Sequence, residues 1–454
     1  MNFKVSLLTI ICATALHAQT SEKSAPVIKN NEAAAATTAT TESKANPPAQ
    51  TQSAPVATEP QKDKSGKLPV GVEYVSGKGL TFDTGDGKFA ATMQHRLQFR
   101  YAYPFDADPR SIANLNEEGH SFMVRRARFK LSGHAFKPWL KYNFQYDWSQ
   151  PILRDFWIGV ERFSWLQLRV GRGKVIYNDE RVSSSGAQQF VNRSIVNDVF
   201  TIDRQQGVQL LGRVLPNTPA DFSYVVGVFA GRGVGERLND DTNLMYAARL
   251  QWNAIGDPIE FTQSDYKSTQ KWQLNIAAGA ATNQSNCTAF ETDATSCRSV
   301  PGSNYTTTIG TAAGTVRPGQ FQVDQAVFEI RSIYKGLYFK HEAHVKRITD
   351  QGTATTPWPR EAEMWGGLVQ LGYFPHNAWD AIPSELEVAG RMAFVDPNIN
   401  IAGNDQYEYT GILNWFANGH SNKISFEVTH HVLQNPAGGY ASEQRYRSQW
   451  EFSF

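Results

Sequence analysis

Apolar and polar side chains alternate along most of the chain from about residue 89 onward. A period of two places successive side chains on opposite sides of a β-strand, whereas an amphipathic helix repeats its apolar positions at intervals of three and four. The pattern therefore predicts strands. In the first of them, one face carries Phe89, Ala91, Met93, His95, Leu97, Phe99 and Tyr101, and the other carries Thr92, Gln94, Arg96, Gln98 and Arg100.

Sixteen segments follow this alternation, near residues 89–101, 122–133, 139–148, 153–161, 165–171, 207–213, 222–230, 244–252, 271–281, 324–333, 336–346, 363–374, 384–395, 407–416, 422–433 and 444–454. Most connections alternate between short and long, although 149–152 is short for its place and 253–270 is long for a turn. An even number of strands with short turns at one end and long loops at the other is typical of outer-membrane barrels. The sequence predicts an all-β fold, a closed transmembrane antiparallel β-barrel of about sixteen strands.

A soluble β-sandwich would also alternate, so the residue types on each face matter. A sandwich core favours Val, Ile and Leu, whereas the apolar face here is rich in Tyr, Trp and Phe near the strand ends. The opposite face carries bulky charges on nearly every strand, as a water-filled interior would. These features favour the barrel and place it in the bacterial outer membrane, in contact with lipids.

The region before the strands differs in composition. Residues 1–18 resemble a secretory signal peptide, and residues 19–70 form a low-complexity tract rich in Ala, Thr, Ser and Pro. Such a tract buries too little apolar surface to offset its ordering entropy, so we expect a flexible periplasmic arm. The barrel is expected over residues 71–454.

Charge and cysteine content exclude several classes of protein. The formal net charge of +1 disfavours a generic nucleic-acid binder, and three Cys are too few for a disulfide-dense scaffold or a zinc cluster. We expect no metal and no cofactor. Cys287 and Cys297 lie in one long loop and are candidates for an extracellular disulfide, because the compartment is oxidising.

The segment 122–133 contains the most informative charges. If Met123, Ala127, Phe129 and Leu131 face lipid, then Arg126, Arg128 and Lys130 face the interior, spaced about 6.6 Å apart along the strand. In a soluble sheet, a basic row is usually a solvated face. In a closed barrel, it would line the pore, joined by Arg96 and Arg100, with Arg125 at a bend or in the membrane interface.

The 35-residue connection 172–206 is long enough to be either functional or mobile. It contains Lys174, and Asp155 is expected to point inward nearby. That carboxylate could accept a hydrogen bond from a protonated phosphate, or it could orient an arginine through a salt bridge. The sequence leaves both roles open.

Several blocks of sequence resemble the phosphate-selective porin O and P family: Met123 to Arg128, Leu140 to Asp147, Leu153-Arg154-Asp155, Leu168 to Lys174, and Asp203 to Leu210. The resemblance implies a homotrimer of sixteen-stranded barrels with an arginine ladder, and an inward third long loop, here 172–206, that narrows the channel. It assigns anion contacts to Arg96, Arg125, Arg126, Arg128, Asp155 and Lys174. The aromatic end at Phe454 also resembles the signal that the bacterial barrel-assembly machinery reads.

These features predict a non-enzymatic porin for passive diffusion of small anions, with phosphate or polyphosphate as the expected solute. The full set of expected pore-lining residues is Arg96, Arg100, Arg125, Arg126, Arg128, Lys130, Asp155 and Lys174. One alternative is a porin of the same architecture for organic acids or sugars, without phosphate binding. A barrel hydrolase is a weaker alternative, because no convincing cluster of catalytic side chains is present.

Overall fold

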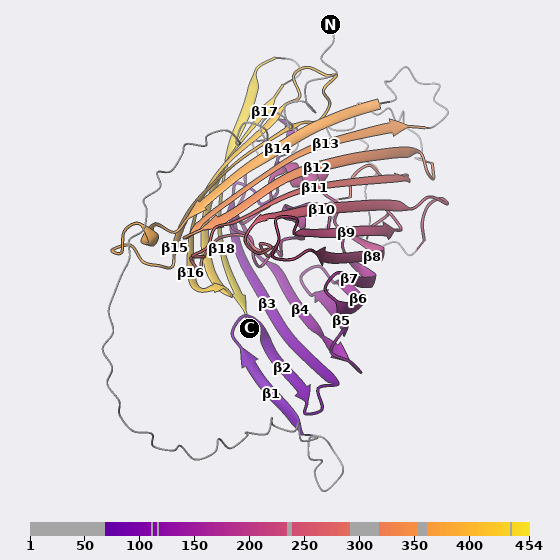
Figure 1. Ribbon diagram of the computed structural model, residues 1–454. Helices are drawn as coiled ribbons and strands as arrows, with labels where there is room; N and C mark the ends of the chain where they lie inside the picture. The colour runs from indigo at the N-terminus through magenta and orange to yellow at the C-terminus, as the bar shows by residue number, and fades with distance from the viewer. Residues whose placement is uncertain are drawn as a thin grey trace, which may run out of the picture. The chain divides into compact units, whose positions relative to one another are not determined.

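A single antiparallel sheet closes on itself to form the body of the protein (Figure 1). The computed structural model describes residues 69–109, 112–115, 118–233, 238–290, 317–351, 361–435 and 438–454. Strands β3 to β18 each pair with the next strand, and β18 returns to pair with β3. This closure confirms the predicted sixteen-stranded barrel, and it leaves no sheet edge among those strands.

The strands of the barrel are β3 (Phe89–Tyr103), β4 (Ser121–Ala135), β5 (Leu140–Asp147), β6 (Ile152–Phe163), β7 (Leu166–Lys174), β8 (Arg204–Val214), β9 (Phe222–Phe229), β10 (Met245–Ile255), β11 (Gln273–Ser285), β12 (Phe321–Tyr334), β13 (Leu337–Asp350), β14 (Glu361–Tyr373), β15 (Leu386–Asp396), β16 (Gln406–His420), β17 (Asn422–Gln434) and β18 (Tyr440–Ser453). The described helical segments are η1 (Ile112–Asn114), α2 (Asp179–Val182), α3 (Ile195–Phe200) and η2 (Pro375–Asn377). None of these helices is long and apolar enough to cross a membrane.

The two faces of the wall have opposite chemistry. On β10, the exposed side chains include Tyr246, Leu250 and Trp252, while the buried positions between them include Arg249 and Gln251. An apolar exterior around a polar interior is the reverse of a soluble sandwich and is the arrangement that a bilayer requires of a barrel.

Two strands before the barrel were not predicted from the sequence. β1 (Val70–Val75) and β2 (Gly79–Thr84) form a hairpin, and β2 pairs with the first part of β3, from Ala90 to Met93. β18 pairs only with the later part of β3, from Arg96 onward. The hairpin therefore continues the wall beyond the end of β18, as Figure 1 shows. The predicted signal peptide and nearly all of the predicted arm lie outside the described residues.

A β-bulge interrupts the alternation on β4. Gln98 pairs with Arg126 but the next residue, Phe99, pairs with Val124, so Arg125 is the extra residue. The expectation that Met123 faces lipid is therefore wrong: it pairs with the inward Arg100, and Val124 faces outward instead. One inserted residue reverses the side of every position beyond it.

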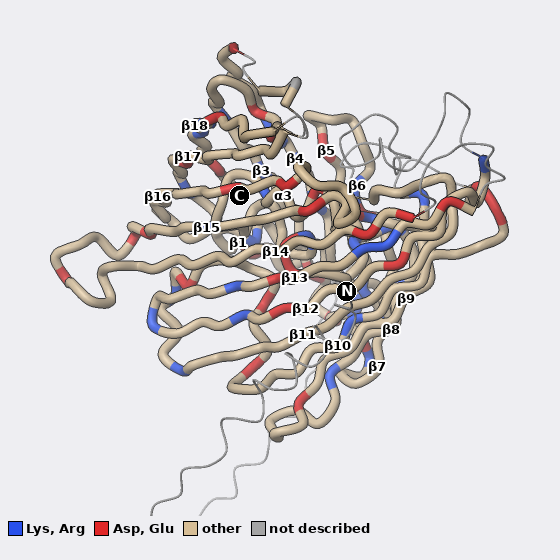
Figure 2. Tube along the Cα trace, turned by 90° about the horizontal axis from the view of Figure 1, so that it is seen from above, with Lys and Arg blue, Asp and Glu red and all other residues tan. Residues whose placement is uncertain are grey.

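Two connections enter the barrel from opposite ends. The connection between β7 and β8 carries α2 and α3, and α3 contacts β13, β14 and β15. Seen from above, α3 lies inside the ring of strands (Figure 2). The connection between β10 and β11 also enters, since its Ile259, Gln263 and Ser264 are buried. We call these the outer lumenal segment (residues 175–203) and the periplasmic lumenal segment (residues 256–272).

Candidate pore-lining site

The centre of the candidate site is a row of cations on the inner face of β3 and β4. Arg96 lies directly opposite Arg128, and Lys130 lies opposite Gln94. Like charges that face each other across a strand pair are destabilising unless a nearby anion or hydrogen-bonding group offsets their repulsion. The backbone therefore holds three cationic side chains close together at one level of the barrel interior.

Each of these cations has a different environment. Arg128 pairs with Asp147, with 2.7 Å between Nε and Oδ2. Arg96 donates to the hydroxyls of Ser184 and Ser185 in the outer lumenal segment, at 2.9 and 3.3 Å. Among the described residues, the Lys130 ammonium makes no hydrogen bond and no ion pair.

Toward the outer end of the same strands, the expected ladder residues are held by protein groups. Arg126 donates to Gln98 at 2.8 Å. Arg100 is only 1% exposed and donates to Asp106, Gln449 and the outer lumenal segment. Arg125, at the bulge, lies 3.6 Å from Asp106. Burial opposes ionisation of Asp106, but the Arg100 guanidinium outweighs it and lowers the pKa of this loop carboxyl.

Asp155 and Lys174 both face the interior, and both have protein partners. Asp155 accepts two hydrogen bonds from Arg204, at 2.7 and 3.2 Å. The Lys174 ammonium donates to three backbone carbonyls, those of Arg181, Val182 and Ser183, at 2.8 to 3.0 Å. These carbonyls lie at the C-terminal end of α2, where a cation is favoured. Lys174 thus braces the outer lumenal segment.

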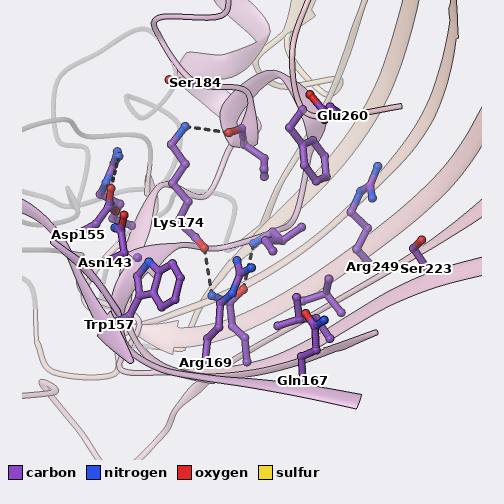
Figure 3. A pocket seen from close by; sticks show the side chains of 18 of the residues that line it. Asn143, Asp155, Trp157, Gln167, Arg169, Lys174, Ser184, Ser223, Arg249 and Glu260 are labelled. Carbon is purple, nitrogen blue, oxygen red and sulfur yellow. Dashed lines mark hydrogen bonds and ion pairs between the residues drawn. The ribbon is translucent and has the colours of Figure 1, made fainter. Parts of the chain in front are cut away.

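A cavity of about 690 Å³ lies against this wall (Figure 3). Its boundary is formed by β3 to β10, by Ser184 and Ser185, and by the periplasmic lumenal segment. Eight lining residues are Lys or Arg and two, Asp155 and Glu260, are carboxylates. The lining cations are Arg96, Arg128, Lys130, Arg169, Lys174, Arg204, Arg213 and Arg249.

The opposite side of the interior is filled by ion pairs. Arg331 on β12 lies 2.7 Å from Asp179 of α2, and Lys340 on β13 lies between Asp179 and Glu342, at 3.8 and 3.7 Å. All four side chains are 1% exposed or less. Breaking such a buried pair by removing one partner leaves an uncompensated charge and costs about 3–5 kcal/mol.

Further carboxylates on β15 to β17 bind backbone amides of the outer lumenal segment. Glu408 accepts from the amide of Ile195 at 2.9 Å and also pairs with Arg391. Glu427 accepts from the amide of Val191 at 2.7 Å. The acidic residues of this wall therefore fix the segment in place.

The two lumenal segments also bind each other. The amide of Gln263 donates to the carbonyl of Ala187 at 2.8 Å, and the amide of Gln189 donates to the Gln263 side chain at 2.9 Å. Glu387 on β15 accepts from both Gln189 and Ser264. Together the segments close the β11–β18 side of the interior and leave the cavity on the other side.

The sequence of this chain matches the phosphate-selective porin O and P family over residues 95–431. That match covers well over half of the chain. The chain belongs to the phosphate-selective porin O and P family. It is an outer-membrane porin, a channel and not an enzyme.

The chain is also similar to solved structures of other porins. A loop L8 deletion mutant of OmpT from Vibrio cholerae has a TM-score of 0.50 at 10% identity, with 81% of this chain and 100% of that chain covered. The anion-selective porin from Comamonas acidovorans has a TM-score of 0.49 at 10% identity and the same coverage. The channel DcaP of Acinetobacter baumannii has a TM-score of 0.49 at 9% identity, covering 82% and 99%. The search of curated proteins found no match.

Sequence reasoning missed several residues of this porin's interior. Glu387, Glu408 and Glu427 occupy inward positions of strands whose side chains alternate between the two faces. That alternation is the sequence signal that could have found them. The inward course of the periplasmic lumenal segment had a weaker signal, namely its unusual length for a turn. Cys287 is buried and disulfide-bonded, while Cys297, its expected partner, lies outside the described residues.

Proposed function

We propose that this porin passes small anions, with phosphate or polyphosphate as its solute, along the basic cavity beside β3 to β10. The observation that carries the proposal is the facing pair Arg96 and Arg128 with Lys130 next to them, all lining the cavity. A planar guanidinium offers paired donors to an oxyanion, and an ammonium adds a point charge.

The magnitudes suit a channel rather than a tight binding site. Two unit charges 4 Å apart attract by about 1 kcal/mol in bulk water and by about 4 kcal/mol at an effective dielectric constant near 20. Several cations can therefore concentrate anions and exclude cations. Conduction also requires that each site release its ion, and Asp155 limits the positive charge at this level.

In this proposal, the outer lumenal segment constricts the path. Lys174 acts on the solute indirectly, since its ammonium braces α2, and Asp155 orients Arg204. The hydroxyls of Ser184 and Ser185 complete the site beside Arg96, because a hydroxyl can donate to an oxyanion as well as accept from an arginine.

A second candidate has the same architecture but passes other small solutes without binding phosphate. The engagement of Lys174 by three carbonyls favours it, because a saturated ammonium contributes less to phosphate binding. We further propose a homotrimer in the outer membrane, as the family resemblance implies. The heat sensitivity of the detergent-solubilised complex on gels tests that assembly.

Planar-bilayer recordings of the purified porin test the function. Across a potassium chloride gradient, we expect the sign of the zero-current potential to show that chloride passes more readily than potassium. Graded inorganic phosphate should then reduce the chloride current. A cation preference would contradict the proposal, and anion preference without a phosphate effect would support the second candidate.

A further inference from the structure

The cavity contains aromatic surfaces next to its cations. Trp157 on β6 and Phe261 of the periplasmic lumenal segment both line it. Figure 3 shows Trp157 beside Arg169 on the strand wall, with Arg249 further along that wall. Inorganic phosphate would use only the charged groups, so the rings are unexplained by the function proposed above.

Three glycines shape the place of Trp157. A Cβ on Gly173 would lie 3.2 Å from the indole Cδ1, and one on Gly159 would lie 3.1 Å from Cζ3. Gly171 has a φ of +132°, and a Cβ there would lie 2.8 Å from the Trp157 Cα. The glycines therefore let the ring lie close to the wall. Arg169 covers the ring at 4.8 Å from its centroid.

Trp157 also presents a hydrogen-bond donor to the cavity. Its side chain is half-buried, and its indole N–H donates to no other group among the residues that the structure describes. An indole N–H at a polar site usually finds a partner, so this donor is available to a solute.

Phe261, like Trp157, has arginine side chains next to its ring. The guanidiniums of Arg249 and Arg331 lie 5.3 and 4.9 Å from its centroid. Arg331 also donates to the carbonyls of Ile259 and Glu260, which fixes the backbone directly before Phe261. The position of the ring is thus set by the barrel wall.

We propose that the cavity selects organic anions in which a phosphate or carboxylate group is joined to an aromatic body. The inference rests on the proposed anion channel and names its solute class. At about 690 Å³ the cavity falls in the size range of small-molecule sites. The anionic group would contact Arg96 and Lys130, and the aromatic body would contact Trp157 and Phe261.

The test compares phenyl phosphate with inorganic phosphate as blockers of the chloride current through the full-length porin. We expect phenyl phosphate to block at a roughly tenfold lower concentration, as expected when an aromatic contact contributes about 1.4 kcal/mol. Trp157→Leu and Phe261→Leu should each reduce this advantage severalfold and leave the block by inorganic phosphate unchanged. Phe156→Leu is the matched control, because Phe156 precedes Trp157 on β6 but faces outward.

Open-channel conductance in chloride, measured in the same recordings, shows that each variant has folded and inserted. Equal block by the two phosphates in the wild-type porin would overturn the inference while leaving anion selectivity intact. A loss of the advantage in Phe156→Leu equal to that in Trp157→Leu would also overturn it. Cation selectivity of the wild-type porin would instead refute the proposed function on which the inference rests.

Discussion

The two sides of the barrel interior carry the same residue types but use them differently. On β3 and β4, Arg96 and Lys130 border a cavity, with serine hydroxyls or open space around them. On β12 to β15, Arg331, Lys340 and Arg391 are buried against carboxylates and the outer lumenal segment. The difference teaches that a cation's role here depends on whether a lumenal segment covers it.

The cost of burial explains the division. A charge removed from water needs a partner and satisfied hydrogen bonds, whereas a charge at a wet cavity keeps its hydration and can exchange it for an ion. The β12–β17 wall supplies carboxylates such as Glu342 and Glu408, and the cavity lining is depleted in them. One side therefore anchors structure, and the other borders the cavity that we propose as the path of the solute.

Removal of an anchor should have the largest effect. Asp179→Ala leaves Arg331 and Lys340 buried without their shared carboxylate, at a cost of about 3–5 kcal/mol. We expect the outer lumenal segment to detach, with a higher single-channel conductance and weaker ion selectivity. Single-channel recording measures both quantities.

The control for that change is an exposed ion pair on the same side of the barrel. Arg347 and Glu363 lie 2.6 Å apart, with side chains 56% and 37% exposed. An exposed pair contributes about 0–1 kcal/mol, so Glu363→Gln should leave conductance unchanged. An unchanged conductance in Asp179→Ala as well would show that the buried pair does not hold the segment.

A smaller effect is expected where the cavity's own carboxylate is neutralised. Asp155→Asn removes a negative charge beside Arg204, which keeps Asp203 at 3.3 Å. Anions should then be held more strongly, with the half-blocking concentration of phosphate lowered about fivefold, since unit charges about 4 Å apart in water interact by about 1 kcal/mol. Titration of the chloride current with phosphate measures it, and weaker block would contradict this role.

The smallest change is expected from a single unpaired cation. Lys130→Gln should raise the half-blocking concentration of phosphate by about threefold, because one of several cations is lost. Lys335→Gln removes the same charge from an exposed turn between β12 and β13 and is the control. Equal shifts in the two variants would mean that overall charge, rather than the cavity, sets the block.

The barrel could be predicted because alternation is a local property. Each strand, from the first at Phe89 to the last ending near Phe454, carries its own period of two, and the number of strands follows from counting. The β1–β2 hairpin escaped because its strands are short and the Gly77 and Gly79 turn lies next to a low-complexity tract. For Arg125 the sequence left a bend and the membrane interface open, because one extra residue leaves no mark in composition.

The chemistry of the interior was less predictable. The alternation along the strands placed Arg96, Arg128 and Lys130 on the inner face. It gave no information about which inward cations a lumenal segment covers. That depends on the course of residues 175–203 and 256–272, which is decided by contacts far apart in sequence. The pairing of Arg331 with Asp179 joins β12 to α2 across 152 positions of sequence, and no local pattern indicates it.

Reversal of one cavity charge tests the central claim most directly. Arg96→Glu places a carboxylate opposite Arg128, and we measure its zero-current potential across a potassium chloride gradient beside that of the wild-type porin. The account predicts that the wild-type potential has the sign of anion preference and that the variant's potential shifts strongly toward cation preference. An unchanged potential would contradict the claim that this wall of the barrel selects the ion.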